Sequence, residues 1–151
     1  MTETQTPVDP TRMTGLQQLE AIRDGLIPAA PIGHTIGMEN FAGERGSFSV
    51  ELVPQERHYN PLGSVHGGVL STLLDTAAGC SVHSTLDVGE AYTSLDLTVK
   101  FLRPVTVESG RLTARGKVIS RGRRTALAEA QVTDAQGRLV AHATSSCMIF
   151  S

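Results

Sequence analysis

The segment from Asn60 to Asp75 restricts the possible folds of this chain more than any other. It reads Asn-Pro-Leu-Gly-Ser-Val-His-Gly-Gly-Val-Leu-Ser-Thr-Leu-Leu-Asp, and its apolar pattern continues beyond the last residue. After Gly68, apolar residues recur at helical spacing, and these are Val69, Leu70, Leu73, Leu74, Ala77 and Ala78. A helix this apolar is mostly buried, so we expect the other elements of the chain to pack on it.

The two ends of this segment carry groups that fit acyl chemistry. Gly67 and Gly68 open the helix, where backbone N–H groups can approach a ligand at the positive end of the helix dipole. Asp75 interrupts the apolar run, and a carboxylate on a mostly buried helix is unfavourable unless it is paired or used. An anion-binding helix start combined with an isolated acid therefore suggests a site for acyl chemistry.

Length and composition limit the class of protein. The chain has 151 residues, 40% of them hydrophobic, which suits one globular domain with its own core. The formal net charge is -2, so a general nucleic-acid surface is not expected. No run of about 18 apolar residues is present, which excludes a membrane-spanning helix. Cys80 and Cys147 lie in apolar-patterned segments and are expected to be buried thiols.

The N-terminal part is expected to differ from the rest of the chain. Residues 1–12 are polar, contain two prolines and lack the apolar centre of a signal peptide, so we expect a disordered tail on a cytoplasmic protein. Residues 13–27 are expected to form a helix, with apolar residues near helical spacing and stop signals at Gly25 and Pro28. Residues 28–37 are expected to form a loop.

Alternating apolar and polar residues predict strands on both sides of the buried helix. One strand covers residues 46–52, and four more follow at residues 94–101, 112–118, 126–132 and 139–149. Short turns separate the later strands, including a basic turn at 121–124 and a hairpin signal at 134–137. This order predicts an α+β fold, in which the strands form an antiparallel meander and the buried helix packs on one face.

Several positions of the sequence together resemble the motifs of a known family. The matching positions are Asn60, Gly63, His66-Gly67-Gly68, Leu74-Asp75, Ser94-Leu95-Asp96 and Phe101-Leu102-Arg103-Pro104. Together they resemble the hotdog-fold acyl-CoA thioesterases, most closely the phenylacetate-degradation (PaaI-like) and human acyl-CoA thioesterase thirteen-like group. The similarity covers residues 32–150. It implies a hotdog thioesterase domain, in which an antiparallel β-sheet wraps around a long central α-helix.

The resemblance implies a role for each residue of the motif. The Gly67 N–H would polarise a thioester carbonyl, while Asp75 would either attack the carbonyl or act as general base on water, and both options stay open. Asn60 would help to place the carbonyl or the water, and Ser94 would hydrogen-bond Asp75 or the water. His66 would orient the loop through hydrogen bonds rather than transfer protons. No metal and no other cofactor are implied.

Each of these residues also has an ordinary explanation when it is taken alone. The His-Gly-Gly run could be a tight connection, Asn60 before a proline could be turn chemistry, and Asp75 could face solvent. A serine on the polar face of a strand is commonplace. Their joint occurrence at the spacing of the family favours a site.

The spacing of Gly67 and Asp75 predicts the oligomeric state. Eight residues separate the two on one helix, which places them about 12 Å apart along its axis. One reacting carbonyl must lie about 3 Å from both its oxyanion donor and its attacking group, so a single helix cannot supply both. Two antiparallel helices related by a two-fold axis can, and we therefore expect a homodimer with two equivalent sites. The resemblance extends this to a dimer of dimers.

The basic turn at 121–124 has two interpretations. It could be a solvated turn, which is the default for a group of basic residues. In related hotdog enzymes this turn and the arginine of the Arg-Pro pair approach the coenzyme A nucleotide, which implies that Arg103, Arg123 and Arg124 bind its phosphates. Arginine suits this role because its forked donors match phosphate oxygens. Gly68 is likewise expected to bind coenzyme A.

Several other chemistries are disfavoured. The histidines lack metal-ligand spacing, and neither a Gly-x-Ser-x-Gly elbow nor a nucleotide-binding glycine loop is present. The hydroxybenzoyl-CoA branch has Glu and Thr where this chain has Asp75 and Gly79, which favours the phenylacetate-type branch. Two rival functions remain: a non-catalytic acyl-CoA-binding module, and a hotdog hydratase or dehydratase built on His66 and Asp75. Acyl- or aryl-CoA thioester hydrolysis is the favoured function.

Overall fold

The computed structural model describes residues 6–151 of the chain. It contains three α-helices, seven β-strands and three short 3-10 turns. The helices are α1 (Gly15–Arg23), α2 (Pro31–Ile36) and α3 (Gly67–His83). The strands are β1 (Met38–Glu44), β2 (Ser47–Leu52), β3 (Ala91–Ser94), β4 (Thr98–Phe101), β5 (Leu112–Arg121), β6 (Thr125–Thr133) and β7 (Leu139–Phe150). The 3-10 turns are Pro10–Arg12, Glu56–His58 and Val107–Ser109.

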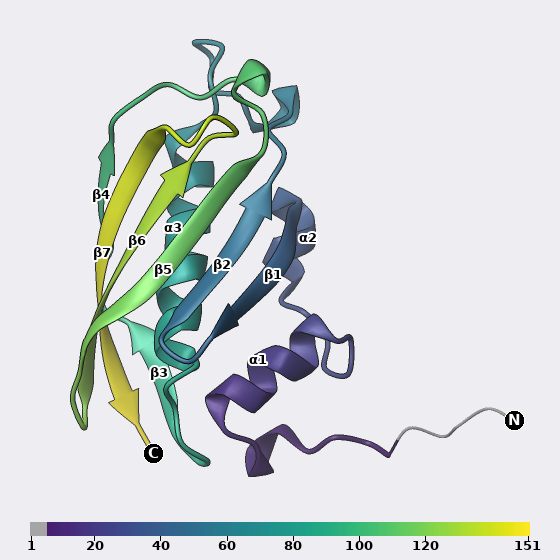
Figure 1. Ribbon diagram of the computed structural model, residues 1–151, viewed down its shortest axis with the longest axis vertical. Coiled ribbons are helices and arrows are strands. Elements are labelled where there is room, and N and C mark those ends of the chain that lie inside the picture. The colour runs from purple at the N-terminus through teal and green to yellow at the C-terminus, as the bar shows by residue number, and fades with distance from the viewer. Residues whose placement is uncertain (1–5) are drawn as a thin grey trace, which may run out of the picture.

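The strands form one sheet whose neighbours are all antiparallel, curved around α3 (Figure 1). Its order is β1-β2-β5-β6-β7-β3, and β4 also pairs with β7, beyond β3 along the same edge. The predicted α+β fold with an antiparallel sheet around a long helix is confirmed. The meander predicted for the strands after the helix is wrong in one detail: β5, β6 and β7 pair in sequence order, but β3 and β4 pair with β7 and not with β5. Between β2 and β3 the chain passes through α3 and crosses from the β1–β2 side of the sheet to the opposite edge.

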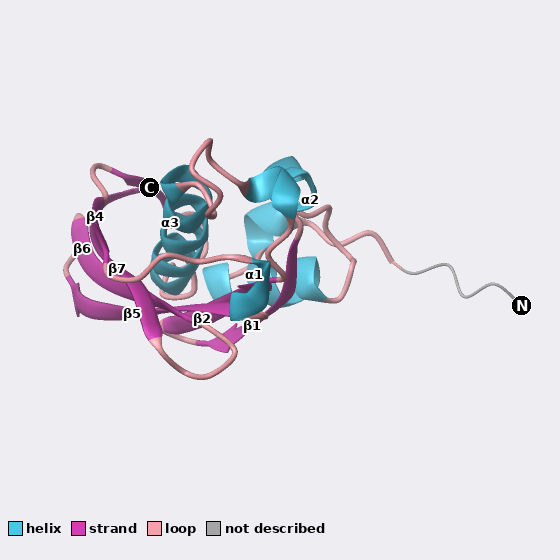
Figure 2. Cartoon of the chain, turned by 90° about the horizontal axis from the view of Figure 1, so that it is seen from above, coloured by secondary structure: helices cyan, strands magenta, loops and turns pink. Residues whose placement is uncertain are grey.

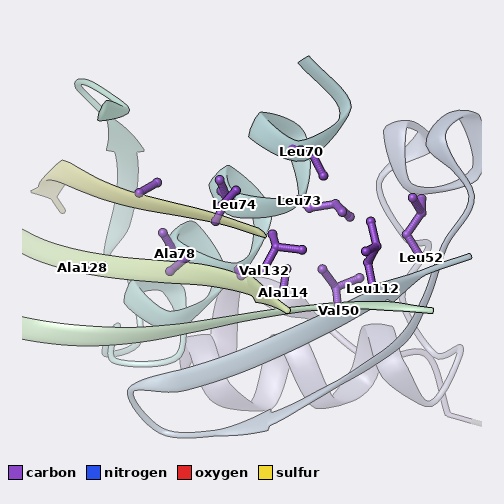
Figure 3. Close-up of a cluster of buried hydrophobic side chains, with 14 of the residues drawn as sticks. Val50, Leu52, Leu70, Leu73, Leu74, Ala78, Leu112, Ala114, Ala128 and Val132 are labelled. Atoms are coloured by element: carbon purple, nitrogen blue, oxygen red, sulfur yellow. The ribbon is translucent and has the colours of Figure 1, made fainter. Parts of the chain in front are cut away.

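The core lies between α3 and the concave face of the sheet, as the view in Figure 2 shows. Leu73, Leu74 and Ala78 of α3 pack against valine, leucine and alanine side chains of β2, β5 and β6 (Figure 3). Gly116 of β5 allows an unusually close approach, because a Cβ atom there would overlap the carbonyl oxygen of Ala77 on α3. Small residues on the strands thus bring the helix close to the sheet, and burial of its apolar face stabilises the fold.

Two elements differ from the sequence-based expectation for residues 28–46. The expected loop contains α2, which starts at Pro31 and ends at Ile36, followed by Gly37 with a left-handed backbone (φ 90°). The strand β1 was not expected either, since most of its residues are exposed and its pairing with β2 is interrupted by a bulge between Glu39 and Ala42. A bulge removes the strict alternation by which strands are predicted.

The strand predicted at 94–101 is divided into β3 and β4. The division occurs at Asp96, whose Oδ1 accepts a hydrogen bond from the Ser146 N–H of β7 (2.8 Å). The carbonyl oxygen of Asp96 accepts from the Ser145 hydroxyl (3.0 Å). These side-chain bonds replace the regular ladder between the two strands, so the alternating pattern continues although the strand does not.

The described part of the N-terminal segment contains a short turn and a helix. The predicted tail covers residues 1–12, of which 1–5 lie outside the described residues. Within it, Pro10–Arg12 forms a 3-10 turn that is capped by Asp9. The helix predicted at 13–27 is shorter, since α1 ends at Arg23, and Thr14 caps its start. No helix within residues 6–151 has the length and apolarity needed to cross a membrane.

Candidate active site

The start of α3 presents one free backbone donor. His66 is the N-cap residue, and its Nδ1 accepts a hydrogen bond from the Gly68 N–H (2.8 Å). Within residues 6–151 the Gly67 N–H donates no hydrogen bond. This N–H therefore stands ready for a ligand at the positive end of the helix dipole. The His66 imidazole thus accepts a hydrogen bond at the start of the helix, and its role in the reaction stays a prediction.

An exposed aromatic ring lies beside this donor. The Phe101 ring, 56% exposed, would lie 2.9 Å from a Cβ atom added at Gly67. Arg103 follows two residues later and is also exposed, so the end of β4 and the start of α3 share one surface. A side chain at position 67 would have to displace the ring, which explains why glycine suits this position.

Asp75 lies in the middle of α3 and contacts the end of β3. The Ser94 hydroxyl donates a hydrogen bond to Asp75 Oδ1 over 3.3 Å, and both residues are exposed. The contact predicted between Ser94 and Asp75 is therefore present, although Ser94 ends its strand rather than beginning it. Only one oxygen of the carboxylate is engaged by this bond, which leaves the other able to bind water or a substrate.

The Asp75–Ser94 pair separates two cavities. The larger, about 950 Å³, extends from this pair between α3 and the helices α1 and α2. The smaller, about 340 Å³, is lined by Ser71, Thr72, Asp75, Ser94, Leu95, Asp96 and Leu97. A group bound at the carboxylate could thus extend in two directions, into a larger cavity with a mostly apolar lining or into a smaller one with a mixed lining.

Asn60 is committed to its own turn. Its Oδ1 accepts from the Leu62 N–H (2.9 Å) and the Ser64 N–H (3.3 Å), and its Nδ2 donates to the Ser64 hydroxyl (3.2 Å). The structure thus gives Asn60 the turn contacts that were weighed as its ordinary explanation. These bonds hold the loop that leads into α3.

The two chemical ends of α3 are separate within one chain. Gly67 and Asp75 are eight residues apart on α3. The distance between them along the helix axis is therefore about 12 Å. His66 is one residue further away, and the structure does not pair it with Asp75. Within one chain the free Gly67 N–H and the Asp75 carboxylate are therefore too far apart to contact the same small group.

The arginines also fall into two groups. The Arg103 N–H donates to the Val140 carbonyl at one end of β7, while the Arg124 carbonyl accepts from the Ile149 N–H near the other end. Nine residues of an extended strand span about 30 Å, so Arg103 does not join Arg124 within one chain. Arg121 is engaged by Glu90, over 2.7 Å.

Cys80 lines the larger cavity but is a poor nucleophile. Burial raises the pKa of its thiol to about 12, and the charge of Asp75 adds to the shift. The thiol is thus protonated at neutral pH, and only the thiolate is a strong nucleophile. Nearby, the Tyr92 hydroxyl would lie 2.9 Å from a Cβ atom at Gly79, so Tyr92 occupies the space that a threonine at position 79 would need.

Helix α1 is fastened to the end of α3. The Gly15 N–H donates to the Leu86 carbonyl (2.9 Å), and His83 Nε2 lies 2.7 Å from Gln18 Oε1. Burial lowers the pKa of His83 below its ordinary value. The His83 ring also meets the edge of Tyr92, with centroids 5.5 Å apart.

This burial predicts a pH-dependent stability. Because His83 binds a proton less tightly in the folded chain than in the unfolded one, its contribution is complete above about pH 6.5 and is lost as the pH falls toward the lowered pKa. We expect the free energy of unfolding in urea to decrease between about pH 7 and pH 5, and to decrease less in His83→Gln. Equal decreases in both proteins would contradict this role of His83.

The sequence did not identify the lining of the larger cavity. Its wall includes Ile22 of α1, Ile32 of α2, Met38 of β1 and Tyr92 of β3. One signal was available, because Pro31 at the start and Gly37 after the end of a short segment are typical of a helix. No local sequence pattern indicates that these four separate segments line one cavity.

Comparison with known proteins places these features in a family. The model of the thioesterase superfamily matches residues 62–141 of the chain. The 1,4-dihydroxy-2-naphthoyl-CoA hydrolase of Listeria monocytogenes is 30% identical over 106 residues, which cover 70% of this chain and 85% of that enzyme. The medium/long-chain acyl-CoA thioesterase YigI of Escherichia coli is 26% identical over 152 aligned positions, covering 91% and 97%.

A solved structure is also similar to this chain in both fold and sequence. The phenylacetic acid degradation-related protein of Ralstonia eutropha superimposes with a TM-score of 0.78 and is 30% identical. The match covers 86% of this chain and 98% of that protein. The region of similarity includes the α3 segment and most of the sheet.

Proposed function

The chain belongs to the thioesterase superfamily and is a thioester hydrolase of hotdog fold, and we propose that it hydrolyses an acyl- or aryl-CoA thioester to a carboxylic acid and free coenzyme A. The observation that carries this proposal is the position of Asp75. Its carboxylate is held by Ser94 at the point where two cavities meet, so an acyl group and a thiol leaving group could extend to opposite sides.

The chemistry requires an oxyanion donor and an activated oxygen nucleophile. The Gly67 N–H would stabilise the negative charge that develops on the thioester oxygen. Asp75 would either attack the carbonyl to form an anhydride that water then hydrolyses, or take a proton from the attacking water. In both cases the carbon–sulfur bond breaks and the thiolate of coenzyme A leaves. Ser94 would position the carboxylate.

The proposed catalytic unit is a homodimer. Because 12 Å separates Gly67 from Asp75 along one helix, the N–H that serves Asp75 would come from the partner subunit, with the two α3 helices antiparallel. The outer edge of the sheet supports this arrangement, since Leu95, Phe101 and Leu102 are each more than half exposed there. Exposed apolar residues on a sheet edge are typical of a surface that pairs with another chain. Assembly of two dimers into a tetramer stays a prediction.

The proposed dimer would also bring Arg103 of one subunit close to Arg124 of the other. Ser94 and Arg124 lie on opposite sides of β7, where Ser94 pairs with Cys147 and the Arg124 carbonyl accepts a hydrogen bond from the Ile149 N–H. The backbones of Ser94 and Arg124 are therefore about 10 Å apart across the sheet. Gly68 and Arg103 of the partner subunit would approach together with its Gly67. We therefore propose that Arg123 and Arg124 of one subunit, with Arg103 of the other, bind the phosphates of coenzyme A. Asn60 and His66 would support the loop that carries Gly67.

Thiol release from a series of acyl-CoAs tests this function. Purified protein should release coenzyme A from at least one short, long or aryl thioester, detected with a thiol reagent. Tight binding of acyl-CoA without release would favour the binding module instead. Hydration of an enoyl-CoA without thiol release would favour the hydratase. Absence of release from every thioester would overturn the proposed hydrolysis by this chain.

A further inference from the structure

We propose that the cavity between α1, α2, β1 and α3 binds the acyl group, and that its shape selects an extended aliphatic chain. This rests on the proposed function, because it assumes that the thioester carbonyl is bound at Asp75. Asp75 and Ser94 line one end of this cavity, so an acyl group attached to that carbonyl has direct access to it. The cavity walls from α1, α2 and β1 precede residues 62–141, so the family match does not define them.

The lining favours an aliphatic ligand. Five aliphatic side chains from four elements face the cavity: Leu19, Ile22, Ile32, Met38 and Val50. Phe41 also lines it, but its ring already packs against Phe48, with centroids 5.1 Å apart. A volume of about 950 Å³ lies near the upper end of the range of roughly 300–1,000 Å³ for small-molecule sites, so there is room for more than a single ring.

The polar groups of the lining are largely occupied elsewhere. Arg23 pairs with Asp24 (3.0 Å), and the Asn40 amide donates to Glu51 (3.3 Å). The Thr76 hydroxyl donates to the Thr72 carbonyl (2.8 Å) within α3. These side chains therefore do not require a polar substituent on the bound acyl group.

The wall is a fixed part of the fold. The Arg57 side chain donates to the carbonyls of Thr35 (2.9 Å) and Ile36 (3.4 Å) at the end of α2. His58, which is 5% exposed, places its Nε2 2.7 Å from the same Ile36 carbonyl. These bonds attach α2 to the rest of the chain, and the contact between Gln18 and His83 attaches α1. Two walls of the cavity are therefore held by specific hydrogen bonds, which favours discrimination between ligands.

Gly33 offers a way to fill the cavity selectively. It lies on α2 and faces the cavity, and the nearest atom to an added Cβ would be Met38 Cε at 3.9 Å. A phenylalanine at this position would extend into the space proposed for the distal part of the acyl chain. His34, the next residue, is exposed and does not line the cavity, so His34→Phe is a matched control.

The experiment compares kcat/KM for straight-chain acyl-CoAs from butanoyl to dodecanoyl, and for benzoyl-CoA. In the wild-type protein kcat/KM should rise by up to about fourfold per added methylene until the cavity is filled. Gly33→Phe should lower the value for dodecanoyl-CoA by about tenfold or more while the value for butanoyl-CoA changes less than about twofold. Gly33→Leu should give a smaller loss in the same direction, and His34→Phe should leave the profile unchanged.

Several results would overturn the assignment of the cavity. These are a wild-type preference for butanoyl- or benzoyl-CoA, and an equal loss at every chain length in Gly33→Phe when its thermal unfolding matches that of the wild type. If Gly33→Phe does not fold, the milder Gly33→Leu and the wild-type profile decide. Absence of hydrolysis of every thioester would instead overturn the proposed function, so the two failures can be distinguished.

Discussion

Replacement of Asp75 by asparagine should lower kcat for thioester hydrolysis by a factor of about 10² to 10⁴, the usual contribution of a general base. The asparagine keeps the volume and can still accept the Ser94 hydroxyl bond, but it cannot take a proton from water or attack a carbonyl at a useful rate. Because Asp75 is exposed on α3, the substitution should leave the thermal unfolding temperature nearly unchanged. Steady-state thiol release by purified wild-type and variant proteins measures the effect.

Asp96→Asn is the matched control for this prediction. Asp96 lines the same small cavity and bears a carboxylate, and its Oδ1 accepts the Ser146 N–H, a bond that an asparagine can retain. We expect this variant to keep kcat within about threefold of the wild type, because a substitution that preserves surface contacts is commonly near neutral. Equal losses in Asp75→Asn and Asp96→Asn would show that general charge, rather than Asp75, supports the reaction.

Replacement of Gly67 by proline should lower kcat by about 10² to 10³, the usual effect of removing one oxyanion donor. Gly67 is the first residue of α3, where proline is well tolerated because no helical hydrogen bond is lost. His66 already has φ -60° and ψ 135°, the extended backbone that a following proline requires. The substitution therefore removes the N–H with little change in the helix.

Gly67→Ala separates the loss of the N–H from steric effects. Both variants place a Cβ atom against the Phe101 ring, but only proline lacks the N–H. We expect Gly67→Ala to retain substantially more activity than Gly67→Pro, and KM to change similarly in both. A similar loss of kcat in the two variants would indicate that contact with Phe101, and not the missing donor, lowers the rate.

The central helix and most of the sheet were predictable because their signals are local. The apolar spacing after Gly68 predicted α3, and strict alternation predicted β2, β5, β6 and β7. By contrast, β1 has few buried residues and a bulge, so its pattern was too weak to recognise. The division between β3 and β4 depends on bonds from Asp96 to β7, about fifty residues away in the sequence, which no local pattern records.

The candidate site was also predictable only in part, because some of its features depend on contacts between segments that are distant in the sequence. The resemblance implied that Ser94 would hydrogen-bond either Asp75 or the water, and the structure contains the bond to Asp75. Asn60 before a proline is typical of a turn, but the sequence does not indicate that both the oxygen and the nitrogen of its amide form hydrogen bonds. The large cavity was not predicted, because its lining depends on how α1 and α2 dock on the rest of the chain.

The most direct test of the two-chain site uses dimers of defined composition. Asp75→Asn and Gly67→Pro chains, co-expressed with different affinity tags, would form a heterodimer with one intact site. We expect about half the wild-type kcat per dimer, since one of two equivalent sites is restored. A wild-type chain paired with a chain that carries both substitutions should be nearly inactive, because each site then lacks one group. The opposite pattern, with activity only in the second heterodimer, would contradict a site shared between subunits.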